Sequence, residues 1–177
     1  SDLTGRAIVS YRAAYFSVTR ESFWALEVLA SLGFRYDSSI FPVRNWRYGI
    51  EDFSPRPQRI DTASGPILEL PISVRRLLGR NVPISGGAYF RLYPYSLTKR
   101  NLSALEAEGR PAVFYLHPWE LDPDHPRVSF HWKARITHYA NLRSTAGKLE
   151  RLLDDFAFAP LGEVLELEIP GARSQLL

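Results

Sequence analysis

Residues 7–40 read AIVSYRAAYFSVTRESFWALEVLASLGFRYDSSI, and this stretch decides the fold class. Its first apolar run, which ends at a tyrosine, predicts a strand. Apolar residues then recur three and four positions apart between Thr19, an expected N-cap, and Gly33, which predicts a helix over residues 20–32. Residues 34–40 predict a second strand. Because strand, helix and strand in this order build parallel sheets, we expect an α/β fold.

The rest of the chain continues this alternation. Pro and Gly punctuate residues 41–93, which we interpret as a loop-rich insertion with a hairpin-like pair of short strands over residues 67–73 and 76–82 and a tight backbone passage at Gly86-Gly87. Pro94 and Gly109 bound a second expected helix. The remaining expected elements are strands over residues 88–93, over residues 112–116 (buried on both faces) and from residue 157, with helices over residues 130–139 and 145–156.

Composition excludes several classes of protein. The 177 residues suit one domain, and 22 basic and 19 acidic residues are mixed along the chain, which argues against a nucleic-acid partner. No apolar run approaches the roughly 18 residues of a membrane span. The absence of Cys excludes disulfides and thiolate metal sites. The chain also contains no Met, so either the initiator was removed before Ser1 or the sequence is a fragment, and composition does not choose between these; it also leaves the oligomeric state and the compartment open.

Polar side chains follow three of the expected strands. Arg12, Asp37 and His117 come at or just after these strands, and ligands of α/β sheets collect at the carboxyl ends of parallel strands. An arginine can hold an anion, a carboxylate can orient it, and an imidazole can transfer protons near neutral pH. Interpretations without a catalytic role stay open: a surface role for Arg12, a turn cap for Asp37, and a structural role for His117.

Two further patterns concern ligands. The four histidines include no His-x-x-x-His pair, so we expect no metal site made from this chain alone. The aromatic residues of the insertion either stack on sugar rings or cover the core, and the sequence does not choose between these roles. They are Phe41, Trp46, Tyr48 and Phe53.

Five blocks of the sequence resemble the NodB-homology polysaccharide deacetylases, in particular the branch associated with exosortase and exopolysaccharide gene clusters. The blocks, in order, are Tyr11-Arg12-Ala13-Ala14-Tyr15-Phe16-Ser17, LGFRYDSSIFP at residues 32–42, GGAYFR at residues 86–91, YLHPWELDP at residues 115–123, and the tail over residues 138–160. Each block is short, but their order and spacing together cover nearly the whole chain. The resemblance is therefore to the C-terminal portion of such an enzyme.

This resemblance implies a distorted β/α barrel and metal-assisted hydrolysis of the N-acetyl groups of a polysaccharide. It implies that Arg12 tethers a catalytic base, that Asp37 lines one wall of the substrate groove, and that His117 is the catalytic acid. Leu116 and Trp119 shape the pocket for the acetyl methyl group, and Tyr15 is expected to contact substrate. The divalent metal, expected to be zinc, is held in the family by residues that this sequence does not contain.

The sequence departs from the family at these points. The Asp-Asp pair that supplies the base and one metal ligand is missing, as is the His-x-x-x-His motif, and Ala14 replaces the usual Pro. For this reason we expect the sequence to be a fragment of such an enzyme, from the bacterial cytoplasm or cell envelope, and we expect the isolated chain to be inactive. The alternative hypotheses are a non-catalytic glycan-binding domain that keeps the groove, and a small interaction domain without a glycan role.

Overall fold

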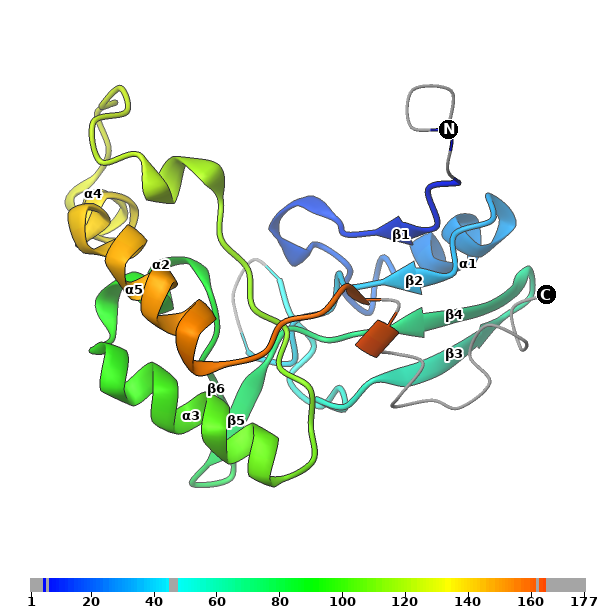
Figure 1. The fold of residues 1–177 in the computed structure, drawn as a ribbon. Coiled ribbons are helices and arrows are strands. Elements are labelled where there is room, and N and C mark those ends of the chain that lie inside the picture. Colours follow the sequence, from blue (N-terminus) through cyan, green and yellow to red (C-terminus); the bar gives the residue numbers. More distant parts are fainter. Residues whose placement is uncertain (1–4, 6, 45–47, 162, 165–177) are drawn as a thin grey trace. The chain divides into compact units, whose positions relative to one another are not determined.

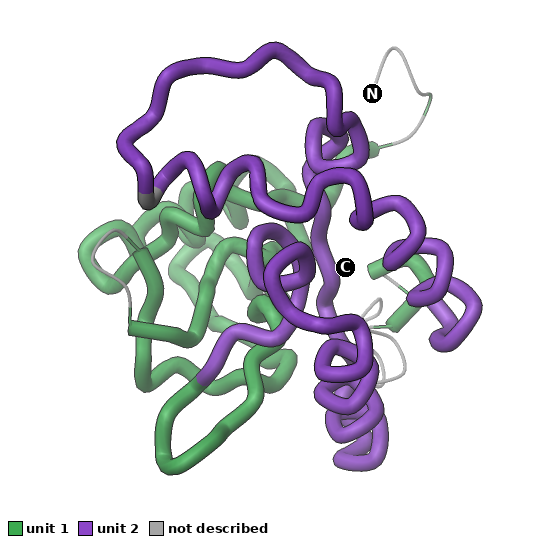
Figure 2. The backbone as a smooth tube through the Cα atoms, turned by 90° about the vertical axis from the view of Figure 1, so that its left-hand side faces the viewer, with its two compact units in different colours: residues 1–81, 159–177 green, residues 82–158 purple. Residues whose placement is uncertain are grey.

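The structure is a computed structural model that describes residues 5, 7–44, 48–161 and 163–164. The chain forms two compact units, coloured green and purple in Figure 2: residues 1–81 with 159–177, and residues 82–158. Each unit has its own cluster of buried apolar side chains. Over the described ranges, no helix is long and apolar enough to cross a membrane.

The first unit is built on a four-stranded sheet in the order β1-β2-β4-β3 (Figure 1). Its strands are β1 (Ser10–Tyr11), β2 (Tyr36–Asp37), β3 (Gln58–Thr62) and β4 (Gly65–Glu69). β1, β2 and β4 run parallel, whereas β3 pairs antiparallel with β4. The register puts Tyr11, Asp37 and Glu69 in one row at the carboxyl ends of the parallel strands. The expected parallel sheet is thus confirmed.

Helix α1 (Trp24–Ser31) packs on β4 and β3. It buries Leu26 and Leu29 in the core of the first unit, and the chain leaves it through Gly33 at φ +84°, as predicted. The predicted N-cap was wrong. Thr19 lies in a turn before the helix, where its N–H donates to Ser22 Oγ (2.9 Å), and such local hydroxyl contacts compete with helix formation.

Three further short elements belong to the first part of the chain. The 3₁₀ helix η1 (Ala14–Phe16) follows β1. The strands β5 (Val74–Leu77) and β6 (Arg80–Pro83) form a separate two-stranded sheet. The predicted pair over residues 67–73 and 76–82 was wrong in its bounds, because residues 67–69 belong to β4 and residues 76–82 contain the turn at Leu78-Gly79 between β5 and β6. β3 was not predicted, because its alternation of half-buried and exposed residues lies inside a Pro-rich stretch that we interpreted as loop.

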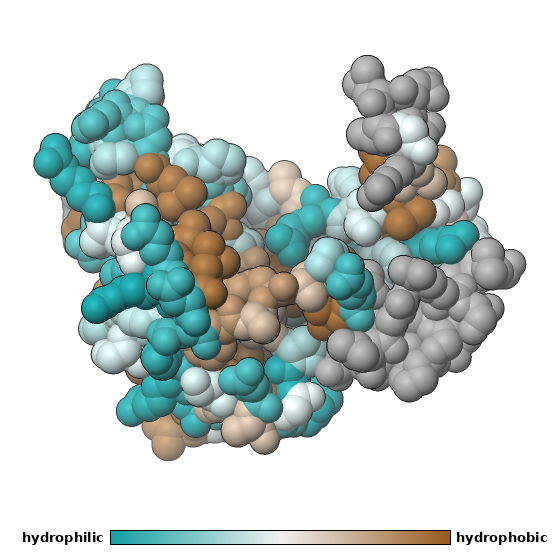
Figure 3. Space-filling model, viewed as in Figure 1, coloured by the Kyte–Doolittle hydropathy of each residue, from teal (hydrophilic) through white to brown (hydrophobic). Residues whose placement is uncertain are grey.

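The second unit is mainly helical. Its helices are α2 (Gly87–Leu92), α3 (Tyr95–Ala107), η2 (Pro118–Leu121), α4 (Trp132–Tyr139) and α5 (Leu142–Asp155). Ile84, Phe90, Leu102, Leu105 and Leu152 are buried together in its core. Figure 3 shows a band of apolar residues beside a hydrophilic surface on this unit. The predicted helices over residues 94–108, 130–139 and 145–156 are confirmed, although the last begins earlier, after Asn141.

Three predicted strands were wrong. Residues 88–93 belong largely to α2, and short apolar runs of this kind suit either structure. Residues 112–116 and 157–159 form no strand in the part of the chain that the structure describes. The side chains of Phe114 and Leu116 pack instead on the helical core, so their apolar pattern reflects contact with helices rather than burial between two faces of a sheet.

Among the described strands no closed barrel forms, so the expected distorted β/α barrel is not confirmed. What the structure contains is a mixed α/β architecture, with parallel strands in a sheet and flanking helices.

Candidate functional site

Arg12 is held at the carboxyl end of β1. Its Nε donates to the carbonyl oxygen of Ser38 (3.1 Å) and its Nη2 lies 2.9 Å from Ser38 Oγ. Ser38 Oγ in turn donates to the carbonyl oxygen of Leu70 (2.7 Å). The guanidinium is therefore oriented by the segments that follow β2 and β4, while Arg12 remains exposed.

Asp37 is joined to the same region through Ser39. Ser39 Oγ donates to Asp37 Oδ1 (2.6 Å) and accepts the N–H of Ala13 (2.7 Å), the residue after Arg12. Arg12 and Asp37 therefore lie at neighbouring strand ends, with Arg12 bonded to Ser38 and Asp37 bonded to Ser39. The contact with Ser39 is also the local contact of a turn-capping aspartate, and Asp37 is completely buried.

A second buried carboxyl group lies beside Asp37. Glu69 is its partner in the β2–β4 register, is likewise fully buried, and accepts the N–H of Ile40 at Oε1 (3.0 Å). Burial, and next the neighbouring Asp37, raise the pKa of Glu69 well above its ordinary value. A protonated Glu69 can donate a hydrogen bond to Asp37, which an ionised Glu69 cannot do.

The second polar group belongs to the second unit and is centred on Trp119. His117 is exposed at the start of η2, and its ring stacks on Trp119 with centroids 5.9 Å apart and planes 11° apart. His138 stacks on the same indole at 4.1 Å, and the rings of His125 and His138 are 5.7 Å apart. Burial, followed by the proximity of His125 and Arg91, lowers the pKa of His138. Its imidazole is thereby biased toward the neutral form.

Beneath this aromatic stack lies a buried ion pair. Arg91 Nε is 2.7 Å from Glu120 Oε2, and the two side chains are 2% and 0% exposed. The other carboxylate oxygen of Glu120 accepts the N–H of His117 (3.0 Å). The exposed histidine is therefore connected through its main chain to charged groups in the interior of the unit.

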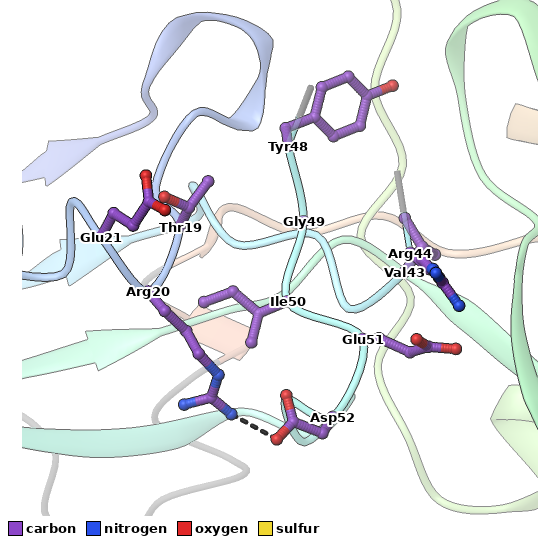
Figure 4. Close-up of a pocket in the computed structure, with 10 residues that line it drawn as sticks. All are labelled: Thr19, Arg20, Glu21, Val43, Arg44, Tyr48, Gly49, Ile50, Glu51 and Asp52. Atoms are coloured by element: carbon purple, nitrogen blue, oxygen red, sulfur yellow. Dashed lines mark hydrogen bonds and ion pairs between the residues drawn. The ribbon is translucent and has the colours of Figure 1, made fainter. Parts of the chain in front are cut away.

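A pocket of about 400 Å³ opens elsewhere on the first unit (Figure 4). Its lining comes from two segments, Thr19, Arg20 and Glu21 from one, and Val43, Arg44, Tyr48, Gly49, Ile50, Glu51 and Asp52 from the other. An exposed ion pair joins Arg20 to Asp52. None of the predicted site residues lines this pocket, and its charged side chains are of both signs, so it defines no ligand class.

The aromatic residues of the insertion mostly serve the core. Phe41 is buried, and Phe53 packs against the core of the first unit. Tyr48 is half-buried and stacks on Phe41, with ring centroids 6.0 Å apart. Trp46 lies outside the described residues.

The predicted site residues fall into two sets. Arg12, Asp37 and Tyr15 belong to the first unit; Tyr15 is 80% exposed in η1 with φ +58°, a conformation that L residues rarely adopt. His117, Trp119 and Leu116 belong to the second, where Leu116 is half-buried against the core. The convergence of the two sets on one substrate stays a prediction.

Metal ligands do not cluster within the structure as described: none of its parts gathers three or more His, Asp or Glu side chains that could hold an ion. These residues by themselves therefore do not fit a zinc centre. Any step through such an ion would depend on ligands supplied by other residues.

Three polar residues of these groups were not predicted. Glu69 follows the apolar pair Ile67-Leu68 and could have been recognised as another polar strand end. Arg91 and Glu120 lie inside quoted sequence blocks, but nothing in their spacing indicates that they pair, because the contact joins residues 29 positions apart.

The family of the chain follows from a comparison of sequences. The model of a family described as a domain of unknown function (DUF3473) matches residues 38–166. The chain belongs to this family. The DUF3473 match includes Glu69, Arg91, His117 and Glu120, whereas Arg12 and Asp37 precede it. Comparison with curated proteins and with solved structures found no match.

Proposed function

We propose that this DUF3473 chain is the C-terminal part of a polysaccharide deacetylase, which hydrolyses N-acetyl groups of an exopolysaccharide with a divalent metal, zinc in the first instance. The observation that carries the proposal is the group at the ends of β1 and β2. There Arg12 and Asp37 come from two separate blocks of the resemblance; the side chain of Arg12 bonds Ser38, and Asp37 bonds Ser39, which also accepts the N–H of Ala13. An exposed, conformationally strained Tyr15 stands three residues from Arg12.

The roles of the side chains follow from their surroundings. Arg12 has a fixed, exposed guanidinium that suits the orientation of an anionic group, the tethered catalytic base of the resemblance. His117 is exposed and can give a proton to the leaving amine, which would otherwise depart as an unstable anion. Asp37 is buried and acts through Ser39 rather than by touching substrate.

The metal contributes polarisation of the amide carbonyl and activation of water when it is bound. Its ligands, and the base that Arg12 tethers, would come from residues beyond this sequence, as would completion of the β/α barrel. The substrate-facing residues of this chain are then Tyr15 in the first unit and Leu116 and Trp119 in the second.

The decisive experiment uses His117→Ala in a protein that joins this chain to the polypeptide encoded upstream of Ser1. Loss of the proton donor should lower the rate of acetate release from an N-acetylglucosamine polymer by about 10²–10⁴-fold, with metal content unchanged. His131→Ala removes another exposed histidine of the same unit and is the matched control. An unchanged rate in His117→Ala contradicts the assigned role, and glycan binding without any turnover by the wild type favours a glycan-binding domain instead.

A further inference from the structure

The buried Arg91–Glu120 pair is attached to the histidine that we assign as proton donor. Glu120 uses one oxygen for Arg91 Nε (2.7 Å) and the other for the N–H of His117 (3.0 Å). A single carboxylate therefore bridges a buried cation and the main chain of an exposed imidazole. Both bonds involve an ionised group, which makes them stronger than neutral hydrogen bonds.

Arg91 is itself fixed on its other side. Its Nη1 donates to the carbonyl oxygens of His138 (2.9 Å) and Ala140 (3.1 Å), and its Nη2 donates to that of Thr137 (2.7 Å). These carbonyls lie at the C-terminal end of α4 and just beyond it, where a helix dipole favours a cation. The carbonyl groups at the end of α4 and just beyond it therefore fix the position of the guanidinium. The guanidinium in turn fixes the carboxylate of Glu120 through their ion pair.

A second connection runs through Trp119. The guanidinium carbon of Arg91 lies 5.2 Å from the Trp119 ring centroid, and Trp119 stacks on the ring of His117. The main chain and the ring of His117 are thus each held by a group that contacts Arg91.

Stability alone is a poor explanation of this arrangement. Moving two charges out of water is costly, and well-packed apolar residues of similar size often stabilise a fold as well or better. What apolar residues cannot supply is an anchor with directional bonds to the N–H of His117. We propose that Arg91 and Glu120 are positioning residues for His117, holding its imidazole in the orientation needed for proton transfer. This inference rests on the deacetylase function proposed above.

The kinetic test compares Glu120→Gln and Arg91→Lys in the protein used for His117→Ala. Glutamine keeps the shape and one acceptor but loses the charge, and lysine keeps the charge but cannot reach all four acceptors of Arg91. Both variants should lower kcat by about 10- to 100-fold, the effect of a small misplacement of a reacting group, with KM and metal content little changed. Lys99→Ala, which removes the Lys99–Asp155 ion pair of the same unit, should leave kcat unchanged.

A second measurement does not depend on activity. In the 177-residue chain, NMR signals of the His117 amide and imidazole should move in Glu120→Gln and in Arg91→Lys, and the amide proton should exchange at least about tenfold faster, because a charged hydrogen bond is lost. If the wild-type protein releases no acetate, the deacetylase proposal is wrong. The NMR signals of His117 would still decide whether Arg91 and Glu120 position this residue. Unchanged His117 signals, an unchanged kcat in an active enzyme, or failure of both variants to fold would each overturn the inference, the last because it would make the pair purely structural.

Discussion

At the scale of single residues, the carboxyl ends of β2 and β4 place two carboxyl side chains in the interior of the first unit. Ionisation of both side chains there would cost much free energy. Asp37 and Glu69 are opposite each other in the register and neither is exposed. Asp37 is bonded by Ser39, and Glu69 by the N–H of Ile40. Because burial is the main cause of the raised pKa of Glu69, we expect Glu69 to be protonated in the folded chain.

This pair predicts a pH dependence of stability. Glu69 keeps its proton in the folded chain at pH values where the unfolded chain, with a pKa of about 4.3, has released it. Its contribution to the free energy of unfolding is therefore full below that pH and is lost as the pH rises through the folded pKa. Glu69→Gln should flatten this fall, by about 1 kcal/mol or more between pH 5 and pH 8 in urea unfolding.

The exposed carboxylate of α1 provides the control for that experiment. Glu27→Gln should keep the wild-type slope, because Glu27 is exposed to water. If Glu69→Gln shows the same slope as the wild type, Glu69 does not keep its proton in the folded chain at these pH values.

At the scale of elements, the longer helices could be predicted and the strands only in part: β1 and β2 lie inside predicted strands, whereas residues of α2 were predicted as a strand. The helices around Leu26 and Leu105 have apolar residues at helical spacing and glycine at their ends, which are local signals. The described strands of the parallel sheet are only two to five residues long, and their pairing depends on distant segments. Residues 112–116 have the composition of a strand, but an apolar run packs equally well against helices.

The glycine pair at the start of α2 is an element-scale feature that the sequence did indicate. Gly86 has φ +71°, and a Cβ there would lie 2.2 Å from the carbonyl oxygen of Tyr115 and 2.6 Å from its ring. The N–H of Gly87 donates to the same carbonyl (3.1 Å). Only residues without a side chain allow the extended segment before His117 to lie this close to α2.

Gly86→Ala should consequently destabilise the second unit by about 3 kcal/mol, the sum of a left-handed alanine and a clash with main chain that cannot move aside. Gly109→Ala is the matched control, since Gly109 also has positive φ (+62°) but has open space around it, and it should cost only about 1 kcal/mol. Denaturant unfolding of both variants measures the difference. Equal losses would mean that the backbone near Tyr115 adjusts freely.

At the scale of the whole molecule, the site could be predicted only in part. Arg12 and Asp37 were brought together as expected, because strand ends of a parallel sheet meet at one edge. The residues that hold His117 depend on contacts of a different kind. Arg91 reaches Glu120 and the end of α4 across dozens of positions, and no local pattern encodes such a pairing.

Because the two units have separate cores, we predict that each unit can unfold locally without the other. Leu26 and Leu105 are fully buried, the first in the core under α1 and the second in the core around α3. Substitution of either by Ala should remove about 2–5 kcal/mol from the unit that contains it, since it leaves a cavity there. In hydrogen exchange, Leu26→Ala should speed exchange in α1 and β4 but not in α3 and α5, and Leu105→Ala should do the reverse. Acceleration of both units by either substitution would show instead that the chain unfolds as one cooperative body, and that its two cores stabilise each other.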